Sequence, residues 1–274
     1  TPSTGGSKPA SPVQAAAATV CTVPARPAPH DPHDAIATAP PASAVPAVRA
    51  VPAVAPVPPP PDRGEPSAQT VIAWYNTHAR DLPWRLPGTT PWEVLVSEVM
   101  SQQTPVARVI PAWQEWMRRW PGPAELAQAP TAEVLRVWGR LGYPRRALRL
   151  IECARSVVEQ HDGILPDDLD ALLALPGVGE YTAGAVLAFA HGRRALVLDT
   201  NVRRVLARAV GGQALPAPSL NRAERERALR LLPDDDATAV HWSVAVMELG
   251  ALVCTARQPD CGACPWRSGC AWLA

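Results

Sequence analysis

Lysine is almost missing from this sequence. Its 274 residues include 26 basic side chains, and every one of these except Lys8 is an arginine. A lysine amine is the usual group with which an enzyme forms a Schiff base on a carbonyl carbon. Beyond Lys8 the chain therefore has no side chain for lysine-dependent covalent catalysis.

Long apolar runs and an excess of charge are missing as well. No stretch approaches the roughly 18–20 apolar residues that cross a bilayer, and the first residues lack the basic, apolar and small-residue order of a secretory signal. Basic and acidic side chains number 26 and 25, so the net charge of the whole chain gives no argument for a nucleic-acid partner. We expect a soluble protein of the cytoplasm.

Strand patterns are confined to residues 195–198, whereas helical patterns fill the chain after residue 66. Apolar residues recur there at spacings of three and four, and segments containing proline and glycine separate them. This predicts an all-α body of roughly ten short helices. The predicted helices are 68–79, 91–103, 105–119, 131–138, 145–159, 167–174, 180–190, 200–210, 221–231 and 239–253.

Residues 1–66 form a separate zone in which proline and alanine dominate, with about half of the 33 prolines. Proline removes backbone donors and disfavours helix in the residue before it, and such a composition cannot bury enough apolar surface to fold. We predict a disordered tail with polyproline character. It is either an inert tail or a docking peptide for a partner.

The cysteines are grouped at one end of the chain. Cys254, Cys261, Cys264 and Cys270 lie within the last 21 residues, while Cys21 and Cys153 stand alone. A secreted disulfide protein spreads its cysteines along the chain, so this group indicates a metal site in a reducing compartment. Thiolates suit zinc or an iron–sulfur cluster. The single Cys-x-x-Cys and the uneven spacings favour iron–sulfur, with a structural zinc site as the alternative.

The segment 175–179, Leu-Pro-Gly-Val-Gly, lies between two predicted helices. Its glycines allow a tight turn and a close approach of the backbone to a neighbour. The next helix then begins with free N–H groups at its positive end, which suits a phosphate. We interpret the segment as a helix-hairpin-helix that grips the DNA backbone. A plain tight turn between helices is the alternative.

Glu98 is the first of two candidate catalytic carboxylates. In a helix its neighbours are Val94, Leu95 and Val99, and an apolar environment raises the pKa of a carboxyl group. A carboxylic acid with a raised pKa can donate a proton near neutral pH. An ordinary exposed helix glutamate is the alternative interpretation.

Asp199 is the second candidate catalytic carboxylate. It precedes Thr200 and Asn201 at the start of a predicted helix, where it can serve as a plain N-cap. The helix N-terminus would also keep Asp199 ionised. A neutral acid and an anion suit cleavage of an N-glycosidic bond, since the first protonates the leaving base and the second stabilises a sugar cation. A base in a duplex must also be flipped out.

These motifs, in this order, resemble those of the MutY-type adenine DNA glycosylases of the helix-hairpin-helix superfamily. The resemblance covers residues 70–270 and includes the segments 79–85, 96–104, 141–143, 175–179, 199–202 and 247–251 together with the cysteine group. It implies an enzyme of base excision repair that removes adenine paired with 8-oxoguanine or guanine in double-stranded DNA. It also implies a [4Fe–4S] cluster on the four cysteines. We expect a monomer associated with the nucleoid.

The resemblance also assigns roles to matching positions. Glu98 would be the acid at adenine and Asp199 the anion at the sugar, supported by Asn201 and Tyr181. The adenine pocket would consist of Arg80, Leu82, Trp84 and Glu248. Gln103 and Tyr143 would be wedged into the base stack around the lesion. The DNA backbone would be contacted by Gly177, Val178, Gly179 and Arg257, although Arg257 can also be a solvated charge.

The architecture implied is two helical lobes with DNA in the cleft between them. A six-helix module would span 86–193, and an iron–sulfur lobe would combine 67–85 with 194–274. Glu98 would come from the first lobe and Asp199 from the edge of the second.

Two other functions are weighed against this one. In endonuclease-III-like relatives, which remove damaged pyrimidines and nick the strand, a lysine stands two residues after the last glycine of the hairpin; here that residue is Tyr181. We therefore expect hydrolysis without efficient nicking. A non-catalytic iron–sulfur protein that binds DNA would need neither Glu98 nor Asp199.

The sequence departs from the family pattern at three places. Ser101 replaces a bulky apolar residue, and Pro144 replaces a frequent second aromatic after Tyr143, which would stiffen that loop. The chain ends at Ala274, whereas family members commonly continue into a domain that recognises 8-oxoguanine. The preference for 8-oxoguanine over guanine therefore stays open, and the missing initial methionine leads us to expect a fragment or a processed chain.

Overall fold

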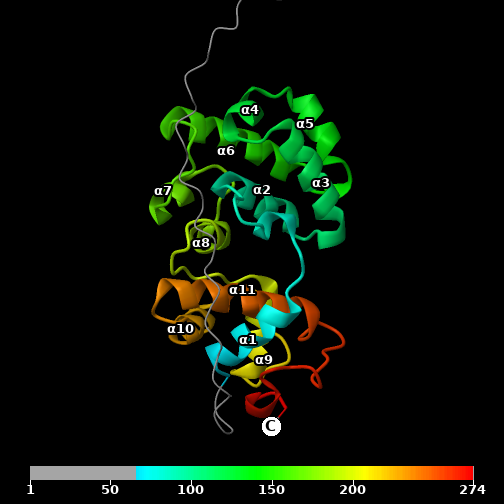
Figure 1. Cartoon of the computed structure of the whole chain (residues 1–274), viewed down its shortest axis with the longest axis vertical. Coiled ribbons are helices and arrows are strands. Elements are labelled where there is room, and N and C mark those ends of the chain that lie inside the picture. Colours follow the sequence, from blue (N-terminus) through cyan, green and yellow to red (C-terminus); the bar gives the residue numbers. More distant parts are fainter. Residues whose placement is uncertain (1–65, 274) are drawn as a thin grey trace, which may run out of the picture. The chain divides into compact units, whose positions relative to one another are not determined.

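The computed structural model describes residues 66–273, which all belong to one compact unit. These residues form helices and connecting loops without any strand, which confirms the all-α prediction (Figure 1). The α-helices are α1 Ala68–His78, α2 Pro91–Ser101, α3 Val106–Arg119, α4 Pro123–Gln128, α5 Thr131–Trp138, α6 Arg145–Gln160, α7 Leu169–Ala174, α8 Glu180–Phe189, α9 Thr200–Ala209, α10 Arg222–Leu231 and α11 Asp236–Leu252. Three short 3₁₀ helices are η1 Pro83–Arg85, η2 Gly139–Leu141 and η3 Arg267–Gly269.

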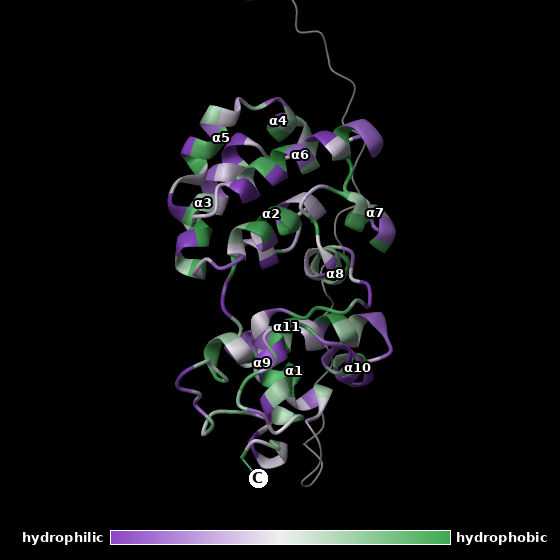
Figure 2. Cartoon of the chain, turned by 180° about the vertical axis from the view of Figure 1, so that it is seen from behind, coloured by the Kyte–Doolittle hydropathy of each residue, from purple (hydrophilic) through white to green (hydrophobic). Residues whose placement is uncertain are grey.

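Two hydrophobic cores divide the described residues into two lobes. The first core lies among α2 to α8 and includes Trp116, whose ring meets those of Trp120 and Trp138 edge-on at 4.9 and 5.6 Å. The second core lies among α1, α9, α10 and α11, and the C-terminal loop closes it with Trp266. Figure 1 shows these helices as two groups, and in both groups hydrophobic and hydrophilic residues alternate along the helices (Figure 2), as amphipathic helices require.

Helix α8 joins the lobes because it packs against α2 on one side and α11 on the other. A small cluster of buried residues from α8, α11 and the segment before α9 fills this junction. A Cβ atom on Gly184 would collide with the carbonyl oxygen of Leu196, so the glycine lets residues 195–198 run directly along the helix. That segment has no regular secondary structure, so the short strand-like pattern in the sequence forms no strand.

Local signals explain where the helices begin. Thr90 and Glu93 form a reciprocal capping box at α2, and Asp168, Asp199 and Asp235 cap α7, α9 and α11 through their carboxylates. The cap at Asp235 starts α11 three residues before the predicted position. Helix α4 was missed because Pro121–Pro123 suggests a breaker, whereas proline at the first helical position is favourable.

The predicted N-terminal tail and the predicted absence of a membrane span can be compared with the structure only within residues 66–273. The disordered tail, with Cys21 in it, falls on residues 1–66 and lies almost wholly outside them. Within 66–273, no helix combines the length and the apolar character that crossing a membrane requires.

Candidate active site

A pocket of about 1050 Å³ opens between the two lobes. It is large enough for an extrahelical nucleobase with its sugar, since small-molecule sites in proteins span roughly 300–1,000 Å³. Its walls come from η1 and the segment before it, α2 and the turn after it, α8, the start of α9, and α11. Among the predicted site residues it brings together Arg80, Leu82, Trp84, Glu98, Gln103, Tyr181, Asp199 and Asn201.

Glu98 lies on the face of α2 that turns toward the other lobe and is only 9% exposed. Burial raises the pKa of its carboxyl group to about 7, and the charge of Asp199 acts in the same direction. The Tyr181 hydroxyl donates a hydrogen bond of 2.6 Å to Glu98 Oε2 and opposes the rise, because it favours the carboxylate. Near neutral pH, Glu98 is therefore poised between acid and carboxylate.

Asp199 caps α9 with one carboxylate oxygen and accepts a side-chain hydrogen bond with the other. Its Oδ1 accepts the backbone N–H of Val202 at 2.6 Å, and its Oδ2 accepts the side-chain amide of Asn201 at 2.7 Å. Burial nevertheless raises the pKa of Asp199 above its ordinary value, and these donors only oppose that rise. The expectation that the helix terminus alone sets this pKa was therefore incomplete.

The two carboxyl groups still differ in the way a division of labour needs. Asp199 has donors on both oxygens, whereas a single hydroxyl faces Glu98. The negative charge of Asp199 raises the pKa of Glu98, and the hydrogen-bond donors around Asp199 favour its carboxylate form. The pair can supply one proton donor and one anion in the same pocket.

Glu248 does not line the pocket, in contrast to the sequence-based expectation. Its side chain is fully buried behind Arg80 and Arg85. Arg80 binds it through Nε at 2.7 Å and Nη2 at 2.9 Å, and Arg85 Nη2 binds it at 3.0 Å. Burial would raise the pKa of Glu248, but the two guanidinium groups outweigh burial and hold it at about 2. Glu248 thus anchors the arginines of the pocket wall.

Gln103 and Tyr143 share an unusual backbone conformation. Their φ angles are +54° and +46°, and Asp162 is the third non-glycine residue with positive φ between residues 66 and 273. This region costs a side-chain-bearing residue roughly 1–2 kcal/mol. Gln103 lines the pocket, whereas Tyr143 stands outside it with 63% of its surface exposed. An exposed aromatic ring on a strained turn is suited to contact with a partner.

The hairpin has the expected geometry with one exception. Gly177 has φ +81° and its α-carbon lies so close to α6 that a Cβ would come within 2.8 Å of Arg149 Cβ. Gly179 begins α8 without a side-chain cap. Val178 is buried and its N–H donates to the Leu175 carbonyl at 3.1 Å, so its amide is not free for a phosphate. Within the described residues 66–273, the amides of Gly177 and Gly179 on either side of it donate no hydrogen bond.

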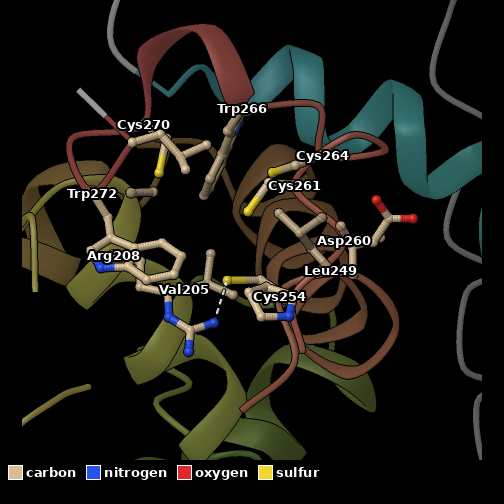
Figure 3. A pocket seen from close by; sticks show the side chains of 14 residues that line it. Val205, Arg208, Leu249, Cys254, Asp260, Cys261, Cys264, Trp266, Cys270 and Trp272 are labelled. Atoms are coloured by element: carbon tan, nitrogen blue, oxygen red, sulfur yellow. Dashed lines mark hydrogen bonds between the residues drawn. The ribbon is translucent and has the colours of Figure 1, made fainter. Parts of the chain in front are cut away.

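The four cysteines converge at the end of the second lobe. Their sulfur atoms point into one pocket, which Val205, Leu249 and Trp266 line with apolar surface (Figure 3). No three of the His, Cys, Asp and Glu side chains in residues 66–273 are close enough to share a single ion. Four thiols around an apolar space wider than an ion fit a polynuclear iron–sulfur core. Cys153, by contrast, lies in the first core, where burial raises the pKa of its thiol to about 12.

Two buried arginines of α9 connect this pocket with the active site. Arg208 donates from Nη1 to Cys254 Sγ at 3.4 Å, the dashed line in Figure 3. Arg204 donates to the Cys254 carbonyl at 2.8 Å and to Asn201 Oδ1 at 2.8 Å. Since Asn201 in turn binds Asp199, hydrogen bonds run without a gap from the first cysteine to this candidate catalytic aspartate.

Comparison with known proteins agrees with this geometry. Residues 96–230 match the model for the HhH-GPD superfamily of base excision DNA repair proteins, and residues 254–270 match the iron–sulfur binding domain of endonuclease III. An adenine DNA glycosylase of Mycobacterium tuberculosis (strain ATCC 25618 / H37Rv) is 56% identical over 209 residues, which cover 75% of this chain and 67% of that protein. The chain belongs to the adenine DNA glycosylases. It is therefore a DNA N-glycosylase of base excision repair with a [4Fe–4S] cluster.

More distant members of the superfamily share the fold of this adenine DNA glycosylase. A thymine/uracil-DNA glycosylase of Pyrobaculum aerophilum is 37% identical over 198 residues, which cover 71% of this chain and 86% of that protein. The solved structure of a thermostable thymine-DNA glycosylase aligns with a TM-score of 0.68 and 29% identity, covering 75% of this chain and 94% of that one. The fold is thus common to enzymes named for different bases.

Sequence reasoning missed part of the pocket wall of the glycosylase. Tyr75 of α1 and His241 of α11 line it, and His241 Nδ1 lies 2.8 Å from the carbonyl oxygen of Ala237. Val240, Val244 and Met247 of α11 also line the pocket, at spacings of four and three residues. From the sequence, this apolar face of α11 is typical of a helix face buried in a core. It lines a pocket only because the two lobes dock against each other.

Proposed function

We propose that this glycosylase hydrolyses the N-glycosidic bond of adenine paired with 8-oxoguanine or guanine, without nicking the strand. Glu98 donates its proton to the departing adenine, and Asp199 stabilises the cationic sugar until water attacks it. The observation that carries this proposal is that one pocket holds a buried Glu98 and an Asp199 that accepts hydrogen bonds on both carboxylate oxygens. Tyr181 and Asn201 hold the two carboxyl groups in place.

The pocket wall suits a flipped base. Trp84 offers a flat apolar face, and Leu82 and the guanidinium of Arg80 lie beside it in the lining. Base–aromatic stacking contributes about 1–3 kcal/mol. We assign recognition of adenine to these three residues and give Glu248 the part of fixing Arg80. Gln103 and Tyr143 would enter the base stack as the adenine leaves it.

The remaining contacts follow from the other motifs. The amides of Gly177 and Gly179 make no hydrogen bond within residues 66–273, so they could bind a phosphate of the DNA backbone. Arg257, which is exposed in the loop between the first two cysteines, could bind another. Cys254, Cys261, Cys264 and Cys270 would ligate the cluster, which serves here as a structural element. The lobe boundaries 86–193 and 67–85 with 194–274, the monomeric state and the association with nucleoid DNA stay predictions.

A product analysis tests the proposal. We expect the protein to release adenine from duplexes with adenine opposite 8-oxoguanine or guanine and to leave an abasic site that only alkali converts to a break, since no lysine follows the hairpin. Duplexes with an oxidised thymine or with thymine opposite guanine should stay intact. Strand breaks on the oxidised-thymine duplex without alkali would contradict the assignment.

The pH dependence of the same reaction tests the role of Glu98. Since the protonated form is the active one and its pKa is about 7, the single-turnover rate should fall by about tenfold per pH unit above that value. Tyr181→Phe removes a hydrogen bond that lowers the pKa of Glu98, so the falling part of the pH–rate profile (its falling limb) should move to higher pH. Glu115→Gln, which changes a residue of α3 outside the pocket, is the control and should leave the falling part of the pH profile in place. A limb that does not move in Tyr181→Phe would contradict the role of Glu98.

A further inference from the structure

One arginine outside the pocket makes more side-chain hydrogen bonds to the backbone than its neighbours on the same helix. Arg146, in the first turn of α6, donates from Nη1 to the carbonyl oxygens of Val99, Met100 and Gln102 at 2.8, 3.1 and 2.6 Å. These are carbonyls at the C-terminal end of α2, which have no partners within their own helix. Arg146 therefore caps the helix that carries Glu98.

The other arm of the same guanidinium reaches a second loop. Nη2 donates to the carbonyl oxygens of Leu141 and Gly142 at 2.9 and 3.2 Å, and to the Thr104 hydroxyl at 3.0 Å. The Thr104 hydroxyl also contacts the Leu141 carbonyl at 3.1 Å. Two loops that are about forty residues apart in the sequence thus share one rigid, planar donor group.

These loops are the ones that hold the strained residues Gln103 and Tyr143. Gln103 lies between Gln102 and Thr104, both bound by Arg146, and Tyr143 directly follows Gly142. The guanidinium also lies 5.6 Å from the centre of the Tyr143 ring and 5.2 Å from that of Trp138. Left-handed backbone at such residues persists only where the surroundings impose it, and here the bonds on either side come from one side chain.

The partners of Arg146 exclude the ordinary role of an arginine. Within residues 66–273 it forms no ion pair, and every acceptor is a backbone carbonyl or a hydroxyl. Its neighbours Arg145 and Arg149 are exposed, and Arg149 pairs with Glu152 instead. The two Nη atoms of Arg146 are therefore occupied with the two loops rather than available for a phosphate.

We propose that Arg146 is a positioning residue for base flipping, which fixes the Gln103 and Tyr143 turns relative to each other and to the helix of Glu98. The inference rests on the proposed insertion of Gln103 and Tyr143 into the DNA. It requires that Arg146 act through both turns at once. A lysine could bind one of the two loops but has no second arm for the other.

A double-mutant cycle tests this. Single-turnover adenine release is measured for Arg146→Gln, for the pair Gln103→Ala with Tyr143→Ala, and for the triple variant, on a duplex with adenine opposite guanine. Arg146→Gln should slow release by about tenfold or more, the effect of losing at least one charge-assisted hydrogen bond. The same change should have little further effect once both inserted side chains are gone, because contacting groups are not additive. Arg146→Lys should recover only part of the rate.

Two further measurements separate positioning from a general loss of structure. A duplex with adenine opposite an abasic site needs less unstacking, so the loss in Arg146→Gln should be smaller on that substrate. A 2-aminopurine in place of the adenine should show a slower rise of fluorescence on mixing. Arg155→Gln is the matched control, since it removes another α6 arginine with one backbone hydrogen bond, to Ala127, and should keep the parental rate.

The outcomes distinguish this inference from the proposed function. If Gln103→Ala with Tyr143→Ala leaves the rate and the fluorescence unchanged, the insertion of these residues is wrong. If the double variant Gln103→Ala with Tyr143→Ala is slow but Arg146→Gln releases adenine at the parental rate, the inference is overturned. It is also overturned if the rate losses of Arg146→Gln and of the double variant multiply in the triple variant, and the loss in Arg146→Gln is the same on both duplexes. Arg146 then has a structural role only.

Discussion

Glu98→Gln is expected to slow adenine release by about 10²–10⁴-fold, which is the usual contribution of a general acid. Glutamine has the shape of glutamic acid and can still accept the hydrogen bond from Tyr181, so α2 and the pocket should keep their structure. It has no acidic proton for the leaving base. The variant should therefore bind a duplex with adenine opposite guanine as tightly as the parent while releasing adenine slowly.

Single-turnover kinetics and a binding titration on the same duplex measure the two halves of this result. Glu115→Gln is the control for the loss of a glutamate, because Glu115 is a partly exposed residue of α3 outside the pocket whose partners are Arg118 and Arg119. The glutamine variant should also lose the dependence on the group with a pKa of about 7. Adenine release within tenfold of the parental rate would show that Glu98 is not the acid.

Asp199→Asn should reduce the rate by about 10²–10³-fold, the size of effect seen when one preorganised electrostatic contact to a transition state is lost. The sugar becomes cationic as the base leaves, and a neutral amide cannot stabilise it as a carboxylate does. Asparagine is as good an N-cap as aspartate, so α9 should still begin at Thr200. The side-chain NH₂ group of the new asparagine would face the NH₂ group of Asn201, which in the parent donates to Asp199 Oδ2. Losing this hydrogen bond should lower the free energy of unfolding by about 1 kcal/mol.

Asp235→Asn is a closely matched control for this change. Asp235 caps α11 through the backbone N–H of Thr238 at 2.8 Å, as Asp199 caps α9 through Val202, but it lies outside the pocket. Urea unfolding of both variants, beside single-turnover kinetics, separates the capping role from the charge. Equal losses of rate in the two variants, or a parental rate in Asp199→Asn, would show that Asp199 acts only as a cap.

The sequence was informative where one residue type and its local pattern decide the outcome. The apolar neighbours of Glu98 lie within one helical turn of it, so its burial could be predicted without any tertiary contact. The cap at Asp199 and the glycines of the hairpin are local for the same reason. The cysteine spacing and the missing lysine are properties of the chain itself.

Properties that depend on the docking of distant segments were not predictable in this way. Glu248 sits 168 positions after Arg80 in the chain, and nothing in its own helix indicates that two guanidinium groups would enclose it. The net rise in the pKa of Asp199 comes from its burial in the folded protein, which its local sequence does not indicate. Arg146 looks like one of several arginines in a basic stretch, and only the structure shows that its acceptors belong to two separate loops.

The division of the catalytic pair between lobes has a thermodynamic consequence. Glu98 belongs to a helix of the first core and Asp199 to a helix of the second, and α8 with its small cluster holds the two cores together. The active form therefore depends on an association equilibrium within one chain, in addition to the folding of each half. A substitution at the α8–α11 junction can weaken that association while both cores persist, and catalysis would then report the fraction of molecules in which the halves are joined.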